Sequence, residues 1–120
     1  LESLDSADGV GITEIQRIAE QVAKMLSESL TAFARLDIDL ARDIFERERK
    51  VDKVYQSALR SLATFMIEDP RNIGSVLNIV WIARSLERVG DHATNIAEYV
   101  IYLVQGVDVR HPDVNENSFT

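Results

Sequence analysis

Four acidic residues repeat the spacing Glu-x-x-x-Asp in two separate parts of the sequence. The first copy is Glu48 with Asp52, and the second is Glu87 with Asp91. Residues four apart stack on one face of an α-helix, where two like charges cost an isolated helix about 0.2–0.5 kcal/mol. Grouped carboxylates raise one another's pKa, bind cations, or pair with Arg and Lys. The spacing therefore predicts a site at which one of these interactions offsets the repulsion.

Three amphipathic helices are expected to carry these acids. Apolar residues recur in steps of three and four through residues 13–36, 37–67 and 70–106, which is the period of helices with one buried face. Thr13 and Gln16 form a possible capping box at the start of the first helix. The connections between the segments are short, so neighbouring helices should run antiparallel. The pattern predicts an all-α fold, an antiparallel three-helix bundle with the up-down-up order of a spectrin-like repeat.

The chain has the length of one domain with a single hydrophobic core. We expect residues 1–12 to form a linker, residues 13–106 the bundle, and residues 107–120 a polar, frayed tail. The sequence begins with Leu1 rather than methionine, which suits a fragment of a longer protein. The predicted organisation is therefore one bundle with two flanking segments.

The hairpin between the second and third helices determines which acids face each other. With its turn at residues 69–70, the helical rise of about 1.5 Å per residue places Glu48 level with Asp91, and Asp52 level with Glu87. Four carboxylates then share one small region. Such an all-oxygen cluster suits Mg²⁺, Ca²⁺, Mn²⁺ or iron, and zinc would also be accepted with less selectivity.

Basic residues near the acids support an alternative interpretation. Arg49, Lys53, Arg84 and Arg88 each lie within one helical turn of an acid. They could neutralise the acids in a salt-bridge network that needs no metal. From the pattern alone, a metal site and a purely structural ion-pair network both remain open.

We expect different roles for three residues near Asp91, namely Gly90, His92 and Asn95. Gly90, with small residues nearby, would let another helix approach closely beside the acids. His92 is turned about 100° from the acid face and is expected to be an edge residue rather than a ligand. Asn95 continues the acid face and could hydrogen-bond an acid or the next helix.

Composition and missing motifs restrict the function. The net charge of −7 argues against a nucleic-acid partner, and the absence of cysteine excludes a thiolate metal site and fits a cytoplasmic protein. The apolar runs are shorter than the about 20 residues of a membrane span, so no membrane insertion is expected. A helical di-iron enzyme needs Glu-x-x-His, and Gly90 takes the place of that histidine. We therefore expect a protein without catalytic activity.

The acid motifs and their flanks resemble the PhoU family of bacterial phosphate-signalling regulators. Residues 84–98, Arg-Ser-Leu-Glu-Arg-Val-Gly-Asp-His-Ala-Thr-Asn-Ile-Ala-Glu, are similar to the signature helix of that family. Residues 48–52 are similar to the preceding helix, and the likeness extends from Ile15 through His111. Family members usually contain two such three-helix repeats, and this chain resembles the second.

The resemblance implies a function that periodicity does not show. It implies metal binding at Glu48, Asp52, Glu87 and Asp91, with iron or zinc as in the family and Mg²⁺ or Mn²⁺ as further options. It also implies a cytoplasmic negative regulator of the phosphate regulon and of phosphate uptake. Such a protein acts as an adaptor between the ATPase of the phosphate ABC transporter and the sensor histidine kinase, commonly as a homodimer.

Overall fold

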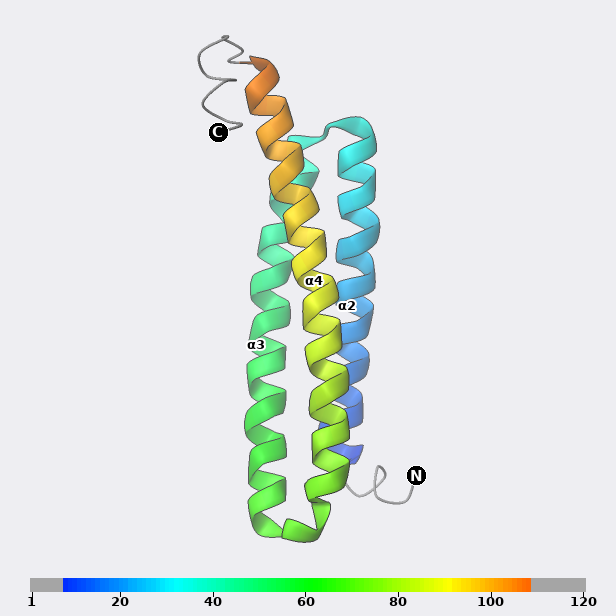
Figure 1. Ribbon diagram of the computed structural model, residues 1–120, viewed down its shortest axis with the longest axis vertical. Helices are drawn as coiled ribbons and strands as arrows, with labels where there is room; N and C mark the ends of the chain where they lie inside the picture. Colours follow the sequence, from blue (N-terminus) through cyan, green and yellow to red (C-terminus); the bar gives the residue numbers. More distant parts are fainter. Residues whose placement is uncertain (1–7, 109–120) are drawn as a thin grey trace.

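The computed structural model describes residues 8–108 and shows three long antiparallel helices (Figure 1). Helix α2 spans Asp8–Arg35, α3 spans Ile38–Glu68 and α4 spans Ile73–Asp108, with a short 3₁₀-helix, η1, at Pro70–Asn72. The three helices pack side by side into a rod of 61 × 26 × 19 Å. The predicted all-α, three-helix, up-down-up architecture is confirmed.

The turn between α2 and α3 is as short as the sequence suggests. Leu36 adopts a φ of 52°, the left-handed conformation that commonly ends a helix. Asp37 is the N-cap of α3, and its Oδ1 accepts a hydrogen bond from the Leu40 backbone N–H at 3.0 Å. These two residues therefore reverse the chain without a longer loop.

The second turn also uses an aspartate as a cap. Asp69 Oδ1 accepts a hydrogen bond from the Arg71 backbone N–H at 3.1 Å, and Pro70 takes the first position of η1. The third helix was expected to begin at Pro70. Its first turn is instead η1, and regular α-helix begins at Ile73.

Helix α2 begins earlier than the sequence pattern suggests. It starts at Asp8, so residues 8–12, expected to belong to a linker, are helical, and Thr13 is not a cap. The reason is tertiary packing at Gly11, which is buried against α3 and α4. A Cβ atom placed at Gly11 would lie 2.8 Å from Ile79 Cδ1 and 3.3 Å from Leu62 Cδ2. This contact supports the additional helical turn.

The other end of the bundle also differs by a few residues. Gly106 was expected to end the third helix, but α4 continues to Asp108. Residues 107 and 108, assigned to the tail, are therefore helical. The rest of the expected tail, residues 109–120, and residues 1–7 of the expected linker lie outside the described part of the chain.

The core consists of one apolar stripe from each helix. Its largest fully buried apolar side chains come from all three helices, namely Ile18, Val22, Met25, Ile44, Leu62, Ile79 and Val100. Several fully buried alanines allow the helices to approach closely, namely Ala32, Ala41, Ala83, Ala93 and Ala97. Burial of these stripes is the main driving force for association of the helices.

Large apolar side chains are also exposed, mainly on α4. On that helix they are Ile73, Leu77, Trp81, Ile82, Tyr99 and Tyr102. Phe33, at the end of α2, stacks on Tyr99 with ring centroids 6.2 Å apart. Exposed apolar patches of this kind often mark surfaces that contact other proteins. None of the helices within residues 8–108 is both long and apolar enough to cross a membrane.

Gly90 faces α2 and also lines the cavity of the acids. It was expected to let another helix approach closely beside the acids, and a Cβ atom there would point to α2, at 3.7 Å from Val22 Cγ2 and 3.9 Å from Met25 Cε. These are ordinary van der Waals distances. The site therefore has room for a methyl group.

The Gly90→Ala variant is expected to be more stable than wild type by about 0.5–1 kcal/mol, because alanine restricts the unfolded chain and favours helix. Urea denaturation of the two proteins without added metal measures this difference. Gly74→Ala is the matched control, since it adds a methyl group to α4 where no atom lies within 4 Å. A Gly90→Ala protein less stable than wild type would show that the backbones of α2 and α4 need the glycine.

Candidate metal site

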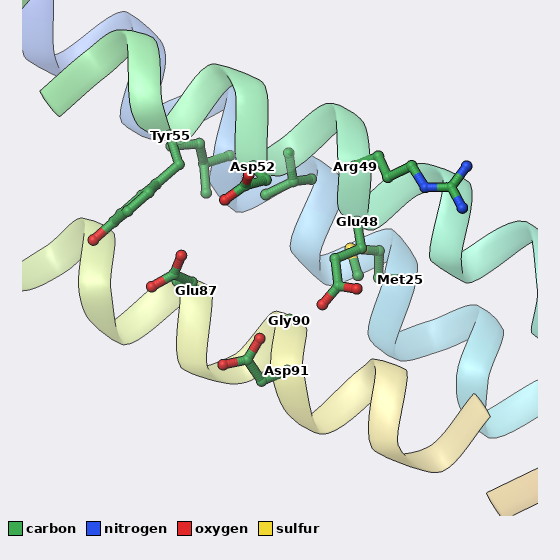
Figure 2. A pocket seen from close by; sticks show the side chains of 10 residues that line it. Met25, Glu48, Arg49, Asp52, Tyr55, Glu87, Gly90 and Asp91 are labelled. Carbon is green, nitrogen blue, oxygen red and sulfur yellow. The ribbon is translucent and has the colours of Figure 1, made fainter. Parts of the chain in front are cut away.

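The four acids of the two motifs line one cavity between α3 and α4 (Figure 2). Glu48 and Asp52 project from α3, and Glu87 and Asp91 project from α4 toward them. The cavity has a volume of about 210 Å³. We call this group of four carboxylates the acid pocket. The hairpin geometry thus brings together the residues that the sequence places at one level.

The floor of the acid pocket is apolar. Ile18 and Met25 of α2 and Val51 of α3 line the cavity beneath the carboxylates, and all three are buried. A cation held above this floor would be shielded from water on one side, which strengthens its attraction to carboxylates. Helix α2 therefore contributes apolar side chains to the pocket without supplying a charged group to it.

The acid pocket fits a cation by its chemistry, although its side chains are not arranged as a complete ligand set. Four carboxylates supply the oxygen donors that hard cations prefer. Within residues 8–108, however, no three Asp, Glu, His or Cys side chains are placed as a metal-binding group. Rotation of the carboxyl groups into the cavity is needed before three of them could share one ion.

The salt-bridge alternative is not supported by the contacts of these acids. The ion pairs of the described residues join Arg17 to Glu14, Arg42 to Asp39, Arg47 to Glu28, Arg49 to Glu46 and Arg71 to Asp69. None of them involves the acid pocket. Arg49, one of the basic residues expected to neutralise the cluster, pairs with Glu46 instead. Within residues 8–108, no cationic side chain therefore forms an ion pair with the carboxylates of the pocket.

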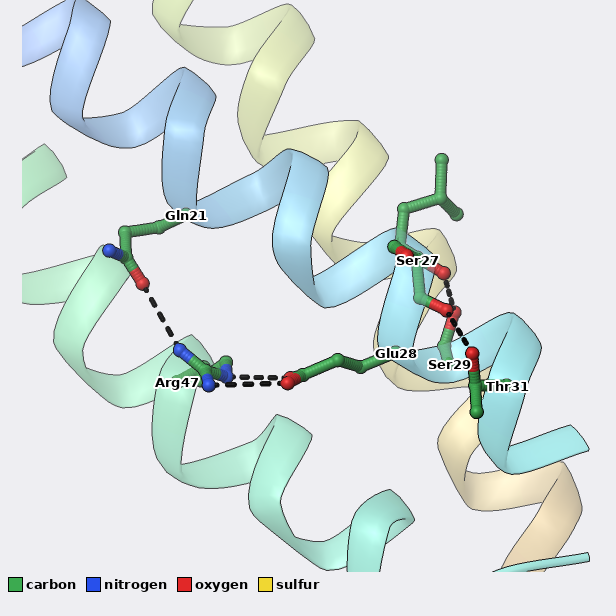
Figure 3. A network of polar contacts seen from close by, with 7 residues as sticks. Gln21, Ser27, Glu28, Ser29, Thr31 and Arg47 are labelled. Carbon is green, nitrogen blue, oxygen red and sulfur yellow. Dashed lines mark hydrogen bonds and ion pairs between the residues drawn. The ribbon is translucent and has the colours of Figure 1, made fainter. Parts of the chain in front are cut away.

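An ion pair next to the acid pocket fastens α3 to α2 (Figure 3). Arg47 Nε lies 2.7 Å from Glu28 Oε1, and its Nη2 lies 3.3 Å from Glu28 Oε2. Its Nη1 also donates to Gln21 Oε1 at 3.5 Å. Arg47 interrupts the apolar stripe of α3, and this paired geometry explains why a charged residue is tolerated there. Because Arg47 is held on the α2 side, the adjacent Glu48 faces α4.

Burial and mutual repulsion act on two of the acids. Burial raises the pKa of Glu48, and the charges of Asp91, Asp52 and Glu98 add to this, while a hydrogen bond from Thr94 opposes it. Burial likewise raises the pKa of Glu87, the charges of Asp91 and Asp52 add to this, and the charge of Arg84 opposes it. Both carboxylates are thus destabilised in their charged form, which is the condition that a bound cation relieves.

A pH dependence of stability follows from these two raised pKa values. A carboxyl group whose pKa is higher in the folded state binds protons more tightly there, so its contribution to stability falls as the pH rises above the ordinary glutamate pKa of about 4.3. Glu87→Gln removes one such group. The stability of Glu87→Gln minus that of wild type, both without metal, is therefore expected to increase with pH in urea titrations. A difference that stays constant or decreases with pH would contradict the raised pKa.

Two hydroxyl residues and a further acid at the site were not predicted from the sequence. Tyr55 lines the cavity, and its pKa is raised by burial and then by the charge of Glu87. The Thr94 hydroxyl donates to the Asp91 carbonyl oxygen at 2.8 Å and lowers the pKa of Glu48, while the charge of Glu98 raises that pKa. Tyr55 has the spacing of a core residue, which concealed its position at the pocket. The spacing that could have identified both hydroxyls is their place three residues after Asp52 and Asp91.

Two polar residues that follow Asp91 on α4, His92 and Asn95, lie outside the acid pocket. His92 and Asn95 line a separate groove between α4 and α2, together with Phe33 and Tyr99. The expectation that His92 lies off the acid face agrees with this position. Asn95 was expected to continue the acid face, but it lines this groove and not the acid pocket, because eight residues turn the helix about 80° from Glu87.

Comparison with known proteins identifies the family. Residues 15–100 match the PhoU domain. The chain belongs to the PhoU family. Its relatives include the PhoU homologue of Pseudomonas aeruginosa, described as a phosphate-specific transport system accessory protein, which is 58% identical over 84% of this chain and 42% of its own length. The Escherichia coli K12 protein of the same description is 43% identical over 83% of this chain and 42% of its own length.

A solved structure agrees with the family assignment. The crystal structure of PhoU from Pseudomonas aeruginosa matches with a TM-score of 0.77 and 57% sequence identity, over 80% of this chain and 46% of that protein. This chain therefore spans less than half the length of the PhoU proteins that it matches. The residues that match the PhoU domain, 15–100, include all four residues of the acid pocket.

Proposed function

We propose that this chain is the cation-binding part of a non-catalytic PhoU protein that regulates phosphate uptake. In this proposal it is a cytoplasmic negative regulator of the phosphate regulon, acting as an adaptor between the ATPase of the phosphate ABC transporter and the sensor histidine kinase. It acts as a homodimer and has no nucleic-acid partner. The observation that supports the proposal most is the PhoU domain match together with relatives described as phosphate transport accessory proteins.

The acid pocket is the proposed cation site. Glu48, Asp52, Glu87 and Asp91 would hold the ion, with iron or zinc as the first candidates and Mg²⁺ or Mn²⁺ as alternatives. A bound ion would supply positive charge that offsets the repulsion among the carboxylates. Because the ligands come from α3 and α4, binding would also hold these two helices together at the level of the pocket.

A purely structural bundle is the alternative function. In that case the acids need neutralisation by side chains, yet no direct ion pair involves them within the described residues. This favours the cation. Metal analysis of purified wild type and Glu87→Ala distinguishes the two functions. Metal in wild type and its loss in the variant would support the proposal, and equally negligible metal in both would favour the structural bundle.

The adaptor role is tested by binding to the two partners. A pull-down assay uses this chain and the full-length protein as baits, with the cytoplasmic part of the sensor kinase and the transporter ATPase as prey. Exposed apolar residues on α4 and the stacked Phe33 and Tyr99 provide surface for such contacts. Failure of both baits to retain either partner would refute the adaptor role.

The absence of catalytic activity is tested separately. A carboxylate-bound metal can activate water only if it keeps an open coordination position. The protein is therefore reconstituted with iron, manganese and zinc in turn and assayed for phosphatase and oxidase activity. Turnover that disappears in Glu87→Ala would contradict the non-catalytic proposal.

A further inference from the structure

Helix α4 exposes a second stripe of large side chains, in addition to the stripe that it buries in the bundle. The members of this outer stripe recur in steps of three, four or seven residues, as one helix face does, and they are Leu77, Trp81, Arg84, Arg88, Asn95, Tyr99 and Tyr102. Its four apolar members are between 42% and 67% exposed. A helix that is apolar on two faces is suited to pack against a further helix outside its own bundle.

One end of the outer stripe borders an apolar groove between α4 and α2. The groove has a volume of about 480 Å³ and is lined by Leu30, Phe33, His92, Asn95, Ile96 and Tyr99. The stacked rings of Phe33 and Tyr99 form part of its wall. This volume falls within the range of about 300–1,000 Å³ that is typical of pockets for drug-sized molecules. The groove is therefore large enough to receive an aromatic side chain.

Trp81, near the other end of the outer stripe, is the most exposed of the large apolar side chains on α4, at 67%. Trp81 and Tyr99 lie nine residues on either side of Gly90, about 13.5 Å from it along the helix axis. Their separation of eighteen residues corresponds to five full turns, so both point to the same side of α4. If two copies of α4 pair antiparallel with Gly90 at the level of a two-fold axis, Trp81 of each copy lies level with the groove of the other.

Charged residues on the outer side of α4 favour this antiparallel direction. Arg84 and Arg88 precede Gly90, whereas Asp91 and Glu98 follow it, and all four charged residues are exposed. Parallel pairing would place like charges opposite each other. Antiparallel pairing about Gly90 brings Arg88 level with Asp91 of the other copy, and Arg84 within about 3 Å, along the axis, of its Glu98. A two-fold axis repeats each of these contacts, so opposite charges meet in four places.

We propose that the outer stripe of α4 is a self-association surface, on which α4 of a second copy of this chain packs antiparallel and Trp81 of each copy enters the apolar groove of the other. Leu77 then meets Tyr102 of the other copy at each end of the contact. This inference rests on the homodimer of the proposed function and assigns its surface. Ile67 and Ile73 lie beyond the paired stretch and stay available to the transporter and the kinase.

The first test measures the monomer–dimer dissociation constant of the whole chain by sedimentation equilibrium. Trp81→Ala is expected to weaken the dimer at least about 10-fold, because central aromatic anchors carry most of the energy of an interface. Ile67→Ala is the matched control, since Ile67 is 76% exposed but lies at the end of α3, outside the paired stretch. It should change the constant less than about 2-fold. Equal constants for Trp81→Ala and wild type would overturn the inference.

The second test exchanges charges across the predicted contact and leaves the acid pocket unchanged. Arg84→Glu and Glu98→Arg each bring like charges together and are each expected to weaken the dimer about 10-fold. The two substitutions combined should restore the wild-type constant to within about 3-fold. Arg60→Glu is the control, because it makes the same change of net charge at an exposed position of α3. A combined variant as weak as the single variants would refute the register.

Introduced cysteines test the direction of pairing, because the chain contains none of its own. Arg84→Cys combined with Asn95→Cys places two thiols at nearly the same level in opposite copies, so a short thiol cross-linker should yield a covalent dimer. Either substitution alone leaves its two thiols about 15–18 Å apart along the axis and should not. Cross-linking of the single variants would show parallel pairing. Absence of the covalent dimer when the double variant is made in the full-length protein would assign the outer stripe to the rest of that polypeptide. Both results would overturn the inference.

The same measurements separate this inference from the proposed function. A wild-type chain whose dissociation constant is weaker than about 1 mM refutes both the homodimer and the inference, while metal analysis and the pull-down assay still decide the cation site and the adaptor role. A dimer that is unaffected by Trp81→Ala, Arg84→Glu and Glu98→Arg overturns the inference alone, because the homodimer then uses another surface.

Discussion

The double variant Glu48→Gln, Glu87→Gln is expected to bind cations at least about 100-fold more weakly than wild type, yet to be more stable than wild type in the absence of metal. Loss of affinity follows because two of four oxygen ligands become neutral, a larger change than removal of groups that orient a ligand, which commonly costs about 10–100-fold. The gain in stability follows because burial and neighbouring acids raise the pKa of both residues. Calorimetry with Mn²⁺ and urea denaturation with a chelator measure the two effects.

A control variant with the same change in total charge shows whether position matters. Glu14→Gln, Glu46→Gln also removes two negative charges, but both acids pair with arginines at the surface. It should keep wild-type affinity for Mn²⁺ and lose a little stability, about 0.2–1 kcal/mol per pair. If the two double variants change affinity and stability alike, the effects come from net charge and the acid pocket is not a specific site.

The opposite signs of these effects explain why the acids are informative about function. A group of residues that lowers the stability of the metal-free fold is not there to hold the bundle together. The buried core of the bundle is formed by the apolar stripes and does not include these acids. The repulsion at Glu48 and Glu87 therefore supports a ligand that offsets it, rather than a structural role.

Much of the fold could be predicted because its main determinants are local. The three-four spacing, the cap at Asp37 and the Asp69-Pro70 turn specify helices and hairpins from neighbouring residues alone. The start of α2 could not be predicted in this way. Its first turn depends on Gly11 packing against Leu62 and Ile79, which are distant in the sequence. Such contacts override local cap preferences.

The candidate site could also be predicted only in part. The hairpin fixes the axial level of the acids, so their convergence on one cavity followed from counting residues. Their partners depend on the rotation of each side chain around its helix. Arg47 is engaged by Glu28 of α2, and Arg49, although it lines the same cavity, pairs with Glu46, so neither forms an ion pair with the four carboxylates. The sequence shows that these arginines lie within a helical turn of the acid motifs, but it does not show which acidic side chains they pair with.

Truncation of Met25, which lines the same cavity, is expected to lower the stability of the metal-free protein, whereas the double glutamine variant is expected to raise it. Met25 is fully buried on α2 and lines the floor beneath the acid pocket. Met25→Ala removes most of this side chain and leaves a void between three helices, which is expected to cost about 2–5 kcal/mol of unfolding free energy. Urea denaturation with a chelator measures this loss, which is a large share of the about 5–15 kcal/mol that stabilises a typical domain.

Met25→Leu separates packing from other properties of the methionine, because it keeps nearly the same volume and should cost less than about 1.5 kcal/mol. If Met25→Ala were also that mild, the floor of the pocket would be loosely packed and α2 would not close it. If Met25→Ala loses much stability while the double glutamine variant gains stability, the apolar floor and the carboxylates have separate effects on the fold. The apolar floor then stabilises the bundle, and the carboxylates above it reduce that stability until a cation binds.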